Sequence, residues 1–244
     1  GAESYIKGFS GYVLDLLTIH YGSFQKLMKG VSRWKALTVI GDKKVAKKLN
    51  PSKLSPLIVI DPVQPDRNAA AALSEEKYYN FILACRAFLR QPSPLFFQEK
   101  HIDPHQLRKH GTLVQIDVVP LDGNRDIVGA KLLKAFTFLK EQIKHHDFTL
   151  IAAKWSYNPV TKKAVYYYVV DKQDLPPTKK HYGPSSEHVK ALVNFKKTHK
   201  DVKMEGKKVY VLKKRPYVSL SLLMIDLIRS ENVTSRVKKT QLSL

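Results

Sequence analysis

The stretch TLVQIDVV at residues 112–119 decides the fold, because its apolar and polar side chains alternate as in a half-buried β-strand. Residues 126–146 follow with helical spacing of apolar positions. Two further apolar segments, 150–157 and 164–170, flank the turn Asn158-Pro159-Val160-Thr161 and predict a β-hairpin. The order strand, helix, strand, strand predicts an α/β sandwich, a fold that often presents RNA on its sheet.

Upstream of this sandwich the pattern is mostly helical. Residues 9–31 predict a helix that Gly22-Ser23 interrupts or restarts, and residues 69–90 predict a second helix, which ends before Pro92-Ser93-Pro94. Between them, residues 57–60 predict a short buried strand. Residues 32–56 are mixed and basic and predict no regular element.

Downstream of residue 172 the sequence predicts a basic helix and hairpin. A helix is expected at 185–199, with Ser185 and Ser186 in a first turn whose free N–H groups could meet a phosphate. A hairpin is expected from strands at 202–204 and 209–212. An apolar helix at 218–231 follows, and residues 232–244 are expected to be frayed.

These patterns predict an α+β protein of three parts. Residues 1–95 form a mostly helical domain, residues 96–172 form the α/β sandwich body, and residues 173–244 form a basic helix-hairpin tail, whose last helix returns to the body. The Pro- and His-rich stretch 91–110 is the predicted connector between the first two parts.

The charge of the chain indicates a polyanionic partner. Lys and Arg number 42 against 21 Asp and Glu, which gives a formal net charge of +21. Residues 172–215 alone contain 13 Lys and Arg against four Asp and Glu. Phosphate backbones are the usual partners of such segments, because each neutralised phosphate releases a counterion. Acidic membrane surfaces are the weaker alternative, since no long helix pairs a cationic face with a Trp or Phe face.

Cysteine usage and hydropathy indicate an intracellular, cytoplasmic protein. Cys85, the one cysteine, lies in an apolar stretch, which predicts a core residue and excludes a disulfide framework. No run approaches the 18 or so apolar residues of a membrane-spanning helix, and the start does not resemble a signal peptide. We therefore expect no membrane partner.

No catalytic or metal-binding residue is predicted in this chain. Asp117 stands on a strand, as some metal-binding carboxylates do, but two-metal chemistry needs several carboxylates, and the sequence contains no Asp-x-Asp. The histidines are loosely spaced and lack cysteines or clustered acids around them. Asp117 is accordingly expected to be an ordinary strand residue.

The loop from Asp61 to Asn68 is the first candidate binding site. Two prolines restrict it, and Arg67 lies between an acidic residue and the next helix. An arginine fork can bind the edge of a base or a phosphate through two parallel hydrogen bonds, and Asp61 or Asp66 could orient it. Alternatively, Arg67 pairs with a neighbouring Asp and only braces the loop. The spacing leaves both alternatives open.

Basic residues interleaved with aromatic ones in residues 177–217 form the second candidate site. Several charge runs recur there on adjacent elements, with tyrosines between them, which favours RNA binding over a merely solvated face. The predicted RNA-binding residues are Lys179, Lys180, Tyr182, Gly183, Lys196, Lys197, Lys213, Lys214 and Arg215.

Two motifs, Gly8-Phe9-Ser10-Gly11-Tyr12 and Asp61-Pro62-Val63 with Arg67-Asn68-Ala69-Ala70-Ala71, resemble the neck of archaeal, class I CCA-adding enzymes, the tRNA nucleotidyltransferases. The resemblance is strong to about residue 110 and patchy beyond it. It implies a neck, body and tail, of which the body and tail bind the acceptor stem and TΨC arm of tRNA. It also implies Arg67, helped by tRNA backbone phosphates, as the reader of the incoming base; with Asp61 from the loop, it makes up the predicted nucleotide-binding site.

The family rebuilds the 3′-terminal CCA of tRNA from CTP and ATP with Mg²⁺. Its catalytic head, which has three metal-binding carboxylates, is expected upstream of Gly1, either as a domain of a longer chain or as a separate subunit. Such a head would dock on an exposed apolar patch, for which Tyr5, Ile6 and Phe9 are the candidates. The alternative function is a non-catalytic RNA-binding or RNA-chaperone module derived from the family.

Overall fold

The computed structural model of the chain describes residues 1–98 and 101–243. It separates into two compact units, Gly1–His101 and Ile102–Leu244. Each unit encloses its own apolar core, built from helices that pack on a small sheet. The α+β class expected from the sequence is confirmed. The finer division at residues 95 and 172 stays a prediction.

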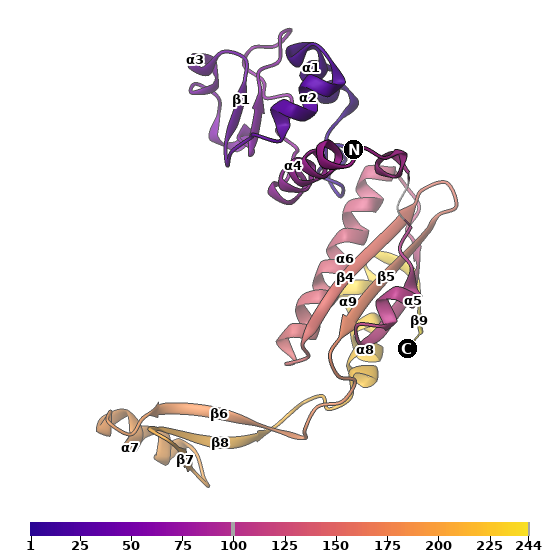
Figure 1. Cartoon of the computed structure of the whole chain (residues 1–244). Coiled ribbons are helices and arrows are strands. Elements are labelled where there is room, and N and C mark those ends of the chain that lie inside the picture. The colour runs from indigo at the N-terminus through magenta and orange to yellow at the C-terminus, as the bar shows by residue number, and fades with distance from the viewer. Residues whose placement is uncertain (99–100, 244) are drawn as a thin grey trace. The chain divides into compact units, whose positions relative to one another are not determined.

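In the first unit, two short parallel strands lie between two layers of helices (Figure 1). Leu57 and Val59 of the second strand pack with the larger helices, whereas Ile58 packs with Ala46 and Leu49 on the opposite side. This alternation is that of a strand covered on both faces. The elements are α1 (Gly11–Tyr21), α2 (Phe24–Val31), β1 (Thr38–Ile40), α3 (Lys43–Ala46), η1 (Pro51–Lys53), β2 (Leu57–Val59), α4 (Glu75–Arg90) and η2 (Pro94–Phe97).

The predicted interruption of the first helix is confirmed. Gly22 ends α1 with a φ of 80°, a conformation that glycine adopts at no steric cost, and its N–H donates to the carbonyl of Thr18. Ser23 then caps α2 by accepting from the N–H of Lys26. Cys85 is buried, as expected, and burial raises the pKa of its thiol to about 11.

Three expectations for this unit were wrong. The second helix begins at Glu75 and not at residue 69, because the buried side chain of Asn68 binds the backbone of Val59 and Ala70 and fixes a turn there. Strand β1 was missed, since three residues between basic segments give too short a pattern. Tyr5 is buried, and Phe9 packs on Phe81 with ring centroids 4.6 Å apart, so these two aromatic side chains belong to packed structure.

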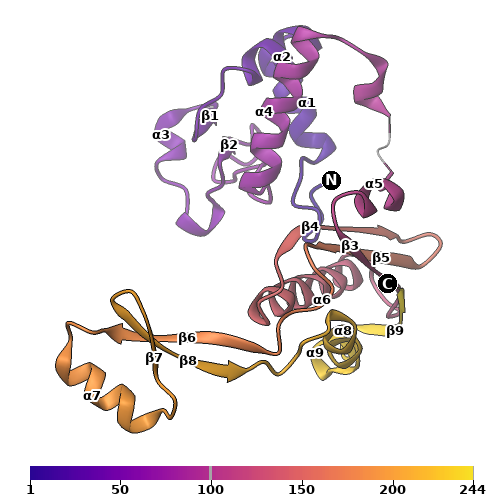
Figure 2. The same ribbon diagram turned by 60° about the horizontal axis from the view of Figure 1, so that its bottom comes forward.

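The second unit is a four-stranded antiparallel sheet in the order β4-β5-β3-β9, with helices α6, α8 and α9 on one face (Figure 2). Tyr166 and Tyr168 point into this core and donate hydrogen bonds to the α6 carbonyls of Leu132 and Phe136, at 2.8 and 2.9 Å. The elements are α5 (Pro104–Arg108), β3 (Thr112–Pro120), α6 (Arg125–His145), β4 (Leu150–Asn158), β5 (Lys163–Val170), α8 (Leu220–Arg229), α9 (Glu231–Thr234) and β9 (Val237–Ser243).

The expectation of a frayed end at residues 232–244 was wrong for the part that the structure describes. Residues 237–243 form β9, which pairs with β3 along its free edge. Val237 is buried and Leu242 packs against the core. Most residues of this strand are lysines or other polar residues, because an edge strand needs few apolar side chains. The sequence therefore shows no apolar pattern there that would predict a strand.

Between β5 and α8 the chain forms a three-stranded sheet, β6-β8-β7, with one helix; we call this segment the arm. Figure 1 shows β6 and β8 as two long strands lying side by side. The arm consists of β6 (Thr178–Ser185), α7 (Val189–Thr198), β7 (Lys203–Glu205) and β8 (Lys208–Lys214).

The predicted hairpin of the arm is confirmed, but its predicted helix start was wrong. Helix α7 begins at Val189, and Ser185 is the last residue of β6, opposite Lys208. The N–H of Ser186 donates to the carbonyl of Lys207 at 2.8 Å, so it is not free to meet a phosphate as expected. Strand β6 was missed because its residues, TKKHYGPS, include two lysines, a glycine and a proline.

Candidate nucleotide pocket and nucleic-acid interface

The loop after β2 forms one wall of a pocket, and the start of α1 forms the other. The pocket is lined by Ser10, Tyr12, Asp61, Val63, Gln64 and Arg67. A bridge between Ile60 and Asn68 closes the loop at its base. Strands β1 and β2 are parallel, so this loop leaves the carboxyl edge of the sheet, which is where ligands bind in open parallel sheets.

Asp61 is the centre of the pocket wall and is almost completely buried. Its Oδ1 atom accepts from the Tyr12 hydroxyl at 2.9 Å, from the N–H of Val63 at 2.9 Å and from the N–H of Gln64 at 3.3 Å. Its Oδ2 atom lies 3.5 Å from Nη1 of Arg67. Asp61 therefore uses one oxygen to fix the loop and α1 and directs the other towards Arg67.

Arg67 combines a fixed backbone with an accessible side chain. Its N–H donates to the carbonyl of Gln64, and its carbonyl accepts from the N–H of Asp61 at 3.2 Å. Its side chain is 54% exposed, whereas that of Asp61 is 3% exposed. The guanidinium is thus held from one side and retains N–H donors for a ligand.

The hydrogen bonds keep Asp61 ionised. The N–H of Val63 contributes most to holding the pKa of Asp61 below its ordinary value; the Tyr12 hydroxyl, the N–H of Gln64 and the charge of Arg67 act in the same direction, while burial opposes them. The same bond to Asp61 raises the pKa of the Tyr12 hydroxyl. Tyr12 is therefore a donor and Asp61 an acceptor at neutral pH.

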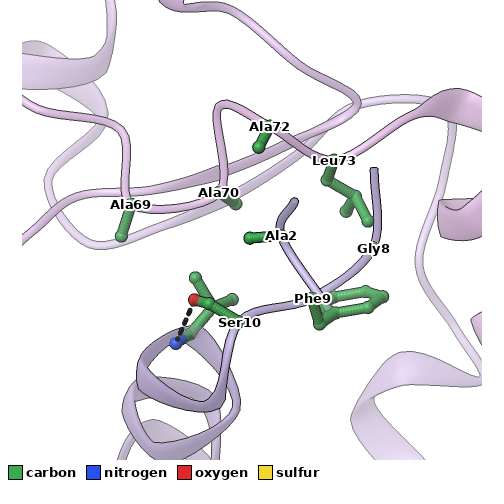
Figure 3. A pocket seen from close by; sticks show the side chains of 9 residues that line it. Ala2, Gly8, Phe9, Ser10, Ala69, Ala70, Ala72 and Leu73 are labelled. Atoms are coloured by element: carbon green, nitrogen blue, oxygen red, sulfur yellow. Dashed lines mark hydrogen bonds between the residues drawn. The ribbon is translucent and has the colours of Figure 1, made fainter. Parts of the chain in front are cut away.

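The segment before α1 lies against the segment that follows Arg67. Figure 3 shows Ala2, Gly8, Phe9 and Ser10 on one side of a small cavity and Ala69, Ala70, Ala72 and Leu73 on the other. Ser10 caps α1 by accepting from the N–H of Val13 at 3.2 Å. Small side chains on both segments allow this close approach, which brings Tyr12 to the loop. From the sequence, Tyr12 was only a member of the predicted helix 9–31 and of the Gly8-Phe9-Ser10-Gly11-Tyr12 motif, so its contact with Asp61 was missed.

The sheet of the arm has one covered and one open face. On the covered face, Val209 and Val211 are buried, and the ring of His181 stacks on that of Phe195 in α7. On the open face, Lys180 is paired in register with Leu212, and Tyr182 with Tyr210. Nζ of Lys180 lies 5.0 Å from the centre of the Tyr210 ring. Exposed cations and aromatic rings thus share this face, an arrangement typical of surfaces that bind nucleic acid strands.

The structure divides the predicted RNA-binding residues into groups. Lys179 and Arg215 both bind the carboxylate of Asp147, and Lys180 and Tyr182 both bind that of Glu205, so these four have acidic partners within the chain. Within residues 1–98 and 101–243, no ion pair holds the other four cations, which are exposed: Lys196 and Lys197 at the end of α7, and Lys213 and Lys214 at the end of β8.

Gly183 has a packing role. A Cβ atom added at this position would lie 2.7 Å from the ring of Phe195, so a larger residue would push β6 away from α7. The glycine therefore permits the close contact between the sheet of the arm and its helix.

Neither a cluster of potential metal ligands nor a candidate membrane span occurs in the part of the chain that the structure describes. No group of three or more His, Cys, Asp or Glu side chains there could hold a metal ion. Asp117 lies in β3 with Nε2 of Gln115 at 3.4 Å from its carboxylate, as a strand residue. No helix in residues 1–98 or 101–243 has the length and apolar composition needed to cross a bilayer.

Comparisons with known proteins identify the relatives of this chain. Residues 1–98 match the family model described as tRNA nucleotidyltransferase, second domain. The CCA-adding enzyme of Pyrobaculum islandicum is 32% identical over 249 residues, covering 97% of this chain and 56% of that protein. The CCA-adding enzyme of Methanosarcina mazei is 36% identical over 194 residues, covering 75% of this chain and 41% of that protein.

The match of residues 1–98 places this part of the chain with the second domain of tRNA nucleotidyltransferases. The chain belongs to the family of archaeal CCA-adding enzymes. It spans about half the length of the curated relatives that it matches.

Proposed function

We propose that this chain is the tRNA-binding and nucleotide-selecting portion of a tRNA nucleotidyltransferase that adds or repairs the 3′-terminal CCA of tRNA from CTP and ATP. The proposal rests above all on Arg67, a half-exposed guanidinium at a pocket rim, held by the buried carboxylate of Asp61. A fork fixed in this way can discriminate between bases by the pattern of their hydrogen-bonding groups.

In this proposal Asp61 acts through Arg67. Its Oδ1 atom already accepts three hydrogen bonds, and burial limits its access to a ligand. Asp61 is therefore a positioning residue, and Arg67 is the residue that contacts the base. The relatives are named CCA-adding enzymes, which supports CTP and ATP as the nucleotides.

The arm supplies the proposed grip on tRNA, at the acceptor stem and TΨC arm. The charge excess of residues 172–215 supports this role, as do the exposed lysines Lys196, Lys197, Lys213 and Lys214. We expect Lys179 and Arg215 to contribute less, because Asp147 already neutralises part of their charge.

The family model covers a second domain, which supports a further domain in the working enzyme. In the proposal, that catalytic head holds Mg²⁺ through its own carboxylates, and this chain has no assigned Mg²⁺ ligand. The head is either a domain of the same polypeptide or a separate subunit. A cytoplasmic location, where tRNA would be repaired, likewise stays a prediction.

The test combines the full chain with a polypeptide carrying the remaining part of the Pyrobaculum islandicum relative, a tRNA lacking its CCA end, CTP and ATP. We expect incorporation that requires both polypeptides. Arg67→Ala should reduce it by about 100- to 1,000-fold, the usual cost of removing a preorganised donor. Arg67→Lys should restore little, because lysine keeps the charge but loses the fork.

Arg33→Ala, which removes another exposed arginine of the same unit, is the matched control and should have no effect. Equal losses in Arg33→Ala and Arg67→Ala would contradict a specific role for Arg67. Alternatively, the chain binds tRNA tightly but no nucleotide is incorporated, whether the head is supplied as a separate polypeptide or as a domain of the same one. That result would favour the non-catalytic RNA-binding or RNA-chaperone module.

A further inference from the structure

Helix α3 and the turn after it expose a dense group of lysines in the first unit. From residue 42 to residue 53, five lysines accompany a single acidic residue, Asp42. All five are exposed. We call them the lysine surface: Lys43, Lys44, Lys47, Lys48 and Lys53.

These lysines have no acidic partner among residues 1–98 and 101–243, the described part of the chain. The carboxylate of Asp42 is used locally, since it accepts from the N–H of Lys44 at 2.7 Å. The apolar residues of the segment point the other way: Ala46 and Leu49 are buried with Ile58 of β2. The segment therefore presents its charge to solvent and its apolar side chains to the sheet.

Two contacts connect the lysine surface to the loop of Arg67. At one end, Gly41 is so close to Ile60 that a Cβ atom added there would lie 2.9 Å from the Ile60 side chain, one residue before Asp61. At the other end, the carbonyl of Lys53 accepts from the side chain of Asn68 at 3.0 Å, one residue after Arg67. Moreover, β1 and β2 are parallel, so the chain enters α3 from the same sheet edge as the loop.

We propose that the lysine surface binds the phosphate backbone of the tRNA strand whose 3′ end is brought to Arg67. This inference rests on the proposed function and adds to it a second electrostatic surface, in the first unit, separate from the arm. If the 3′ end of the tRNA strand lies at the pocket rim, the phosphates that precede it are within reach of the elements that flank the loop. Helix α3 is one of these elements.

The alternative partner for a lysine-rich surface is an acidic membrane. Interfacial helices bind membranes by combining cations with an apolar face that inserts between lipids. Here the apolar side chains of α3 are already packed on β1 and β2, and α3 is four residues long. The chemistry of the surface therefore favours a polyanion bound from water.

The first test measures how the affinity of the full chain for a tRNA lacking CCA depends on salt. Each phosphate contact contributes a slope of roughly 0.7 to 0.9 in a plot of log K against log salt. The variant Lys43→Gln/Lys47→Gln should lower the slope by about 1 to 2. The matched variant Lys26→Gln/Lys29→Gln, which removes two exposed lysines from α2 of the same unit, should leave it unchanged.

The second test locates the contact. Cys85 is buried, so a cysteine introduced by Lys47→Cys can be labelled selectively with an iron chelate that cleaves nearby RNA. We expect cleavage of the bound tRNA within the last few nucleotides of its 3′ strand. The same chelate on Lys26→Cys should cleave that strand weakly.

Three outcomes would overturn the inference: equal slope changes in both double variants, cleavage from Lys47→Cys away from the 3′ end, or binding to phosphatidylserine vesicles that depends on Lys43 and Lys47. The arm variant Lys213→Ala/Lys214→Ala shows whether only the lysine-surface inference fails or whether the proposed function fails as well. If that variant weakens tRNA binding while the α3 variant does not, the lysine surface alone is refuted. If the unmodified chain does not bind tRNA, the proposed function fails.

Discussion

The Arg67 loop and the arm both offer cations to a nucleic acid, but they hold them in different ways. Arg67 is one cation, oriented by a buried carboxylate that accepts three further hydrogen bonds. The arm presents several cations, of which Lys213 and Lys214 are exposed and held by no ion pair in residues 1–98 and 101–243.

This difference separates selectivity from affinity. An oriented guanidinium loses little conformational freedom on binding and binds one pattern of hydrogen-bonding groups more tightly than others. It can therefore discriminate between nucleotide bases. Mobile lysines bind any phosphate, contribute through counterion release and weaken with salt. Changes in the loop should therefore alter which nucleotide is accepted, and changes in the arm should alter how tightly tRNA is held.

Among substitutions that keep Arg67, the largest effect should follow from Asp61→Asn. The amide keeps the shape of the side chain but removes the charge that orients Arg67. In the two-polypeptide incorporation assay we expect the preference for CTP over UTP to fall by about 10- to 100-fold, the typical cost of removing a group that supports a binding residue. Asp66→Asn, an exposed acid in the same loop, is the control. Equal effects of the two substitutions would contradict the orienting role.

A smaller effect on a different quantity should follow from Lys213→Ala/Lys214→Ala. We expect tRNA affinity to fall by about 10-fold near 0.1 M salt and the salt slope to fall by about 1 to 2, with the nucleotide preference unchanged. The exposed pair Lys131→Ala/Lys134→Ala on α6 serves as control. If the arm variant also changed the nucleotide preference, the assignment of selectivity to the loop and of affinity to the arm would be wrong.

The smallest effect should follow from Tyr12→Phe, which removes a single hydrogen bond to Asp61. Because that bond lowers the pKa of Asp61 below its ordinary value of 3.8, its loss should raise this pKa. Arg67 is oriented while Asp61 is ionised, so its orientation is lost as pH falls through the Asp61 pKa, and in the variant this loss occurs at higher pH. A ¹³C NMR titration of the Asp61 carboxyl group measures the midpoint directly.

An unchanged midpoint in Tyr12→Phe would show that Val63 and Gln64 suffice to hold Asp61 ionised. We expect the nucleotide preference to change by about 3-fold at neutral pH, less than in Asp61→Asn, since one neutral hydrogen bond is worth less than a charge. Tyr79→Phe, an exposed tyrosine on α4, is the matched control for the titration.

Long periodic segments were predictable from the sequence because their signal is local. Helix α6, the β4-β5 hairpin and strand β3 each bury a regular set of apolar side chains, and their spacing is visible without knowledge of the partner. The break at Gly22-Ser23 was predictable for the same reason, since a glycine in the left-handed region and a capping serine are local features.

Elements made by distant pairing were missed. Strand β9 follows β3 by more than 110 residues and is polar along most of its length, so its identity depends on the free edge that β3 offers. Strand β6 likewise depends on β8 and contains Gly183 and Pro184, which weaken any strand pattern.

The sequence by itself determined the kinds of groups available: an arginine that follows two acidic residues in a proline-restricted loop, and a basic, aromatic segment near the end. The tertiary structure decided how each group is used. It buried Asp61 and brought Tyr12 to it across 49 residues, and it paired Lys179 and Arg215 with Asp147 while leaving Lys213 and Lys214 exposed. The physical reason is that burial and hydrogen bonding depend on neighbours in space, which local patterns do not encode.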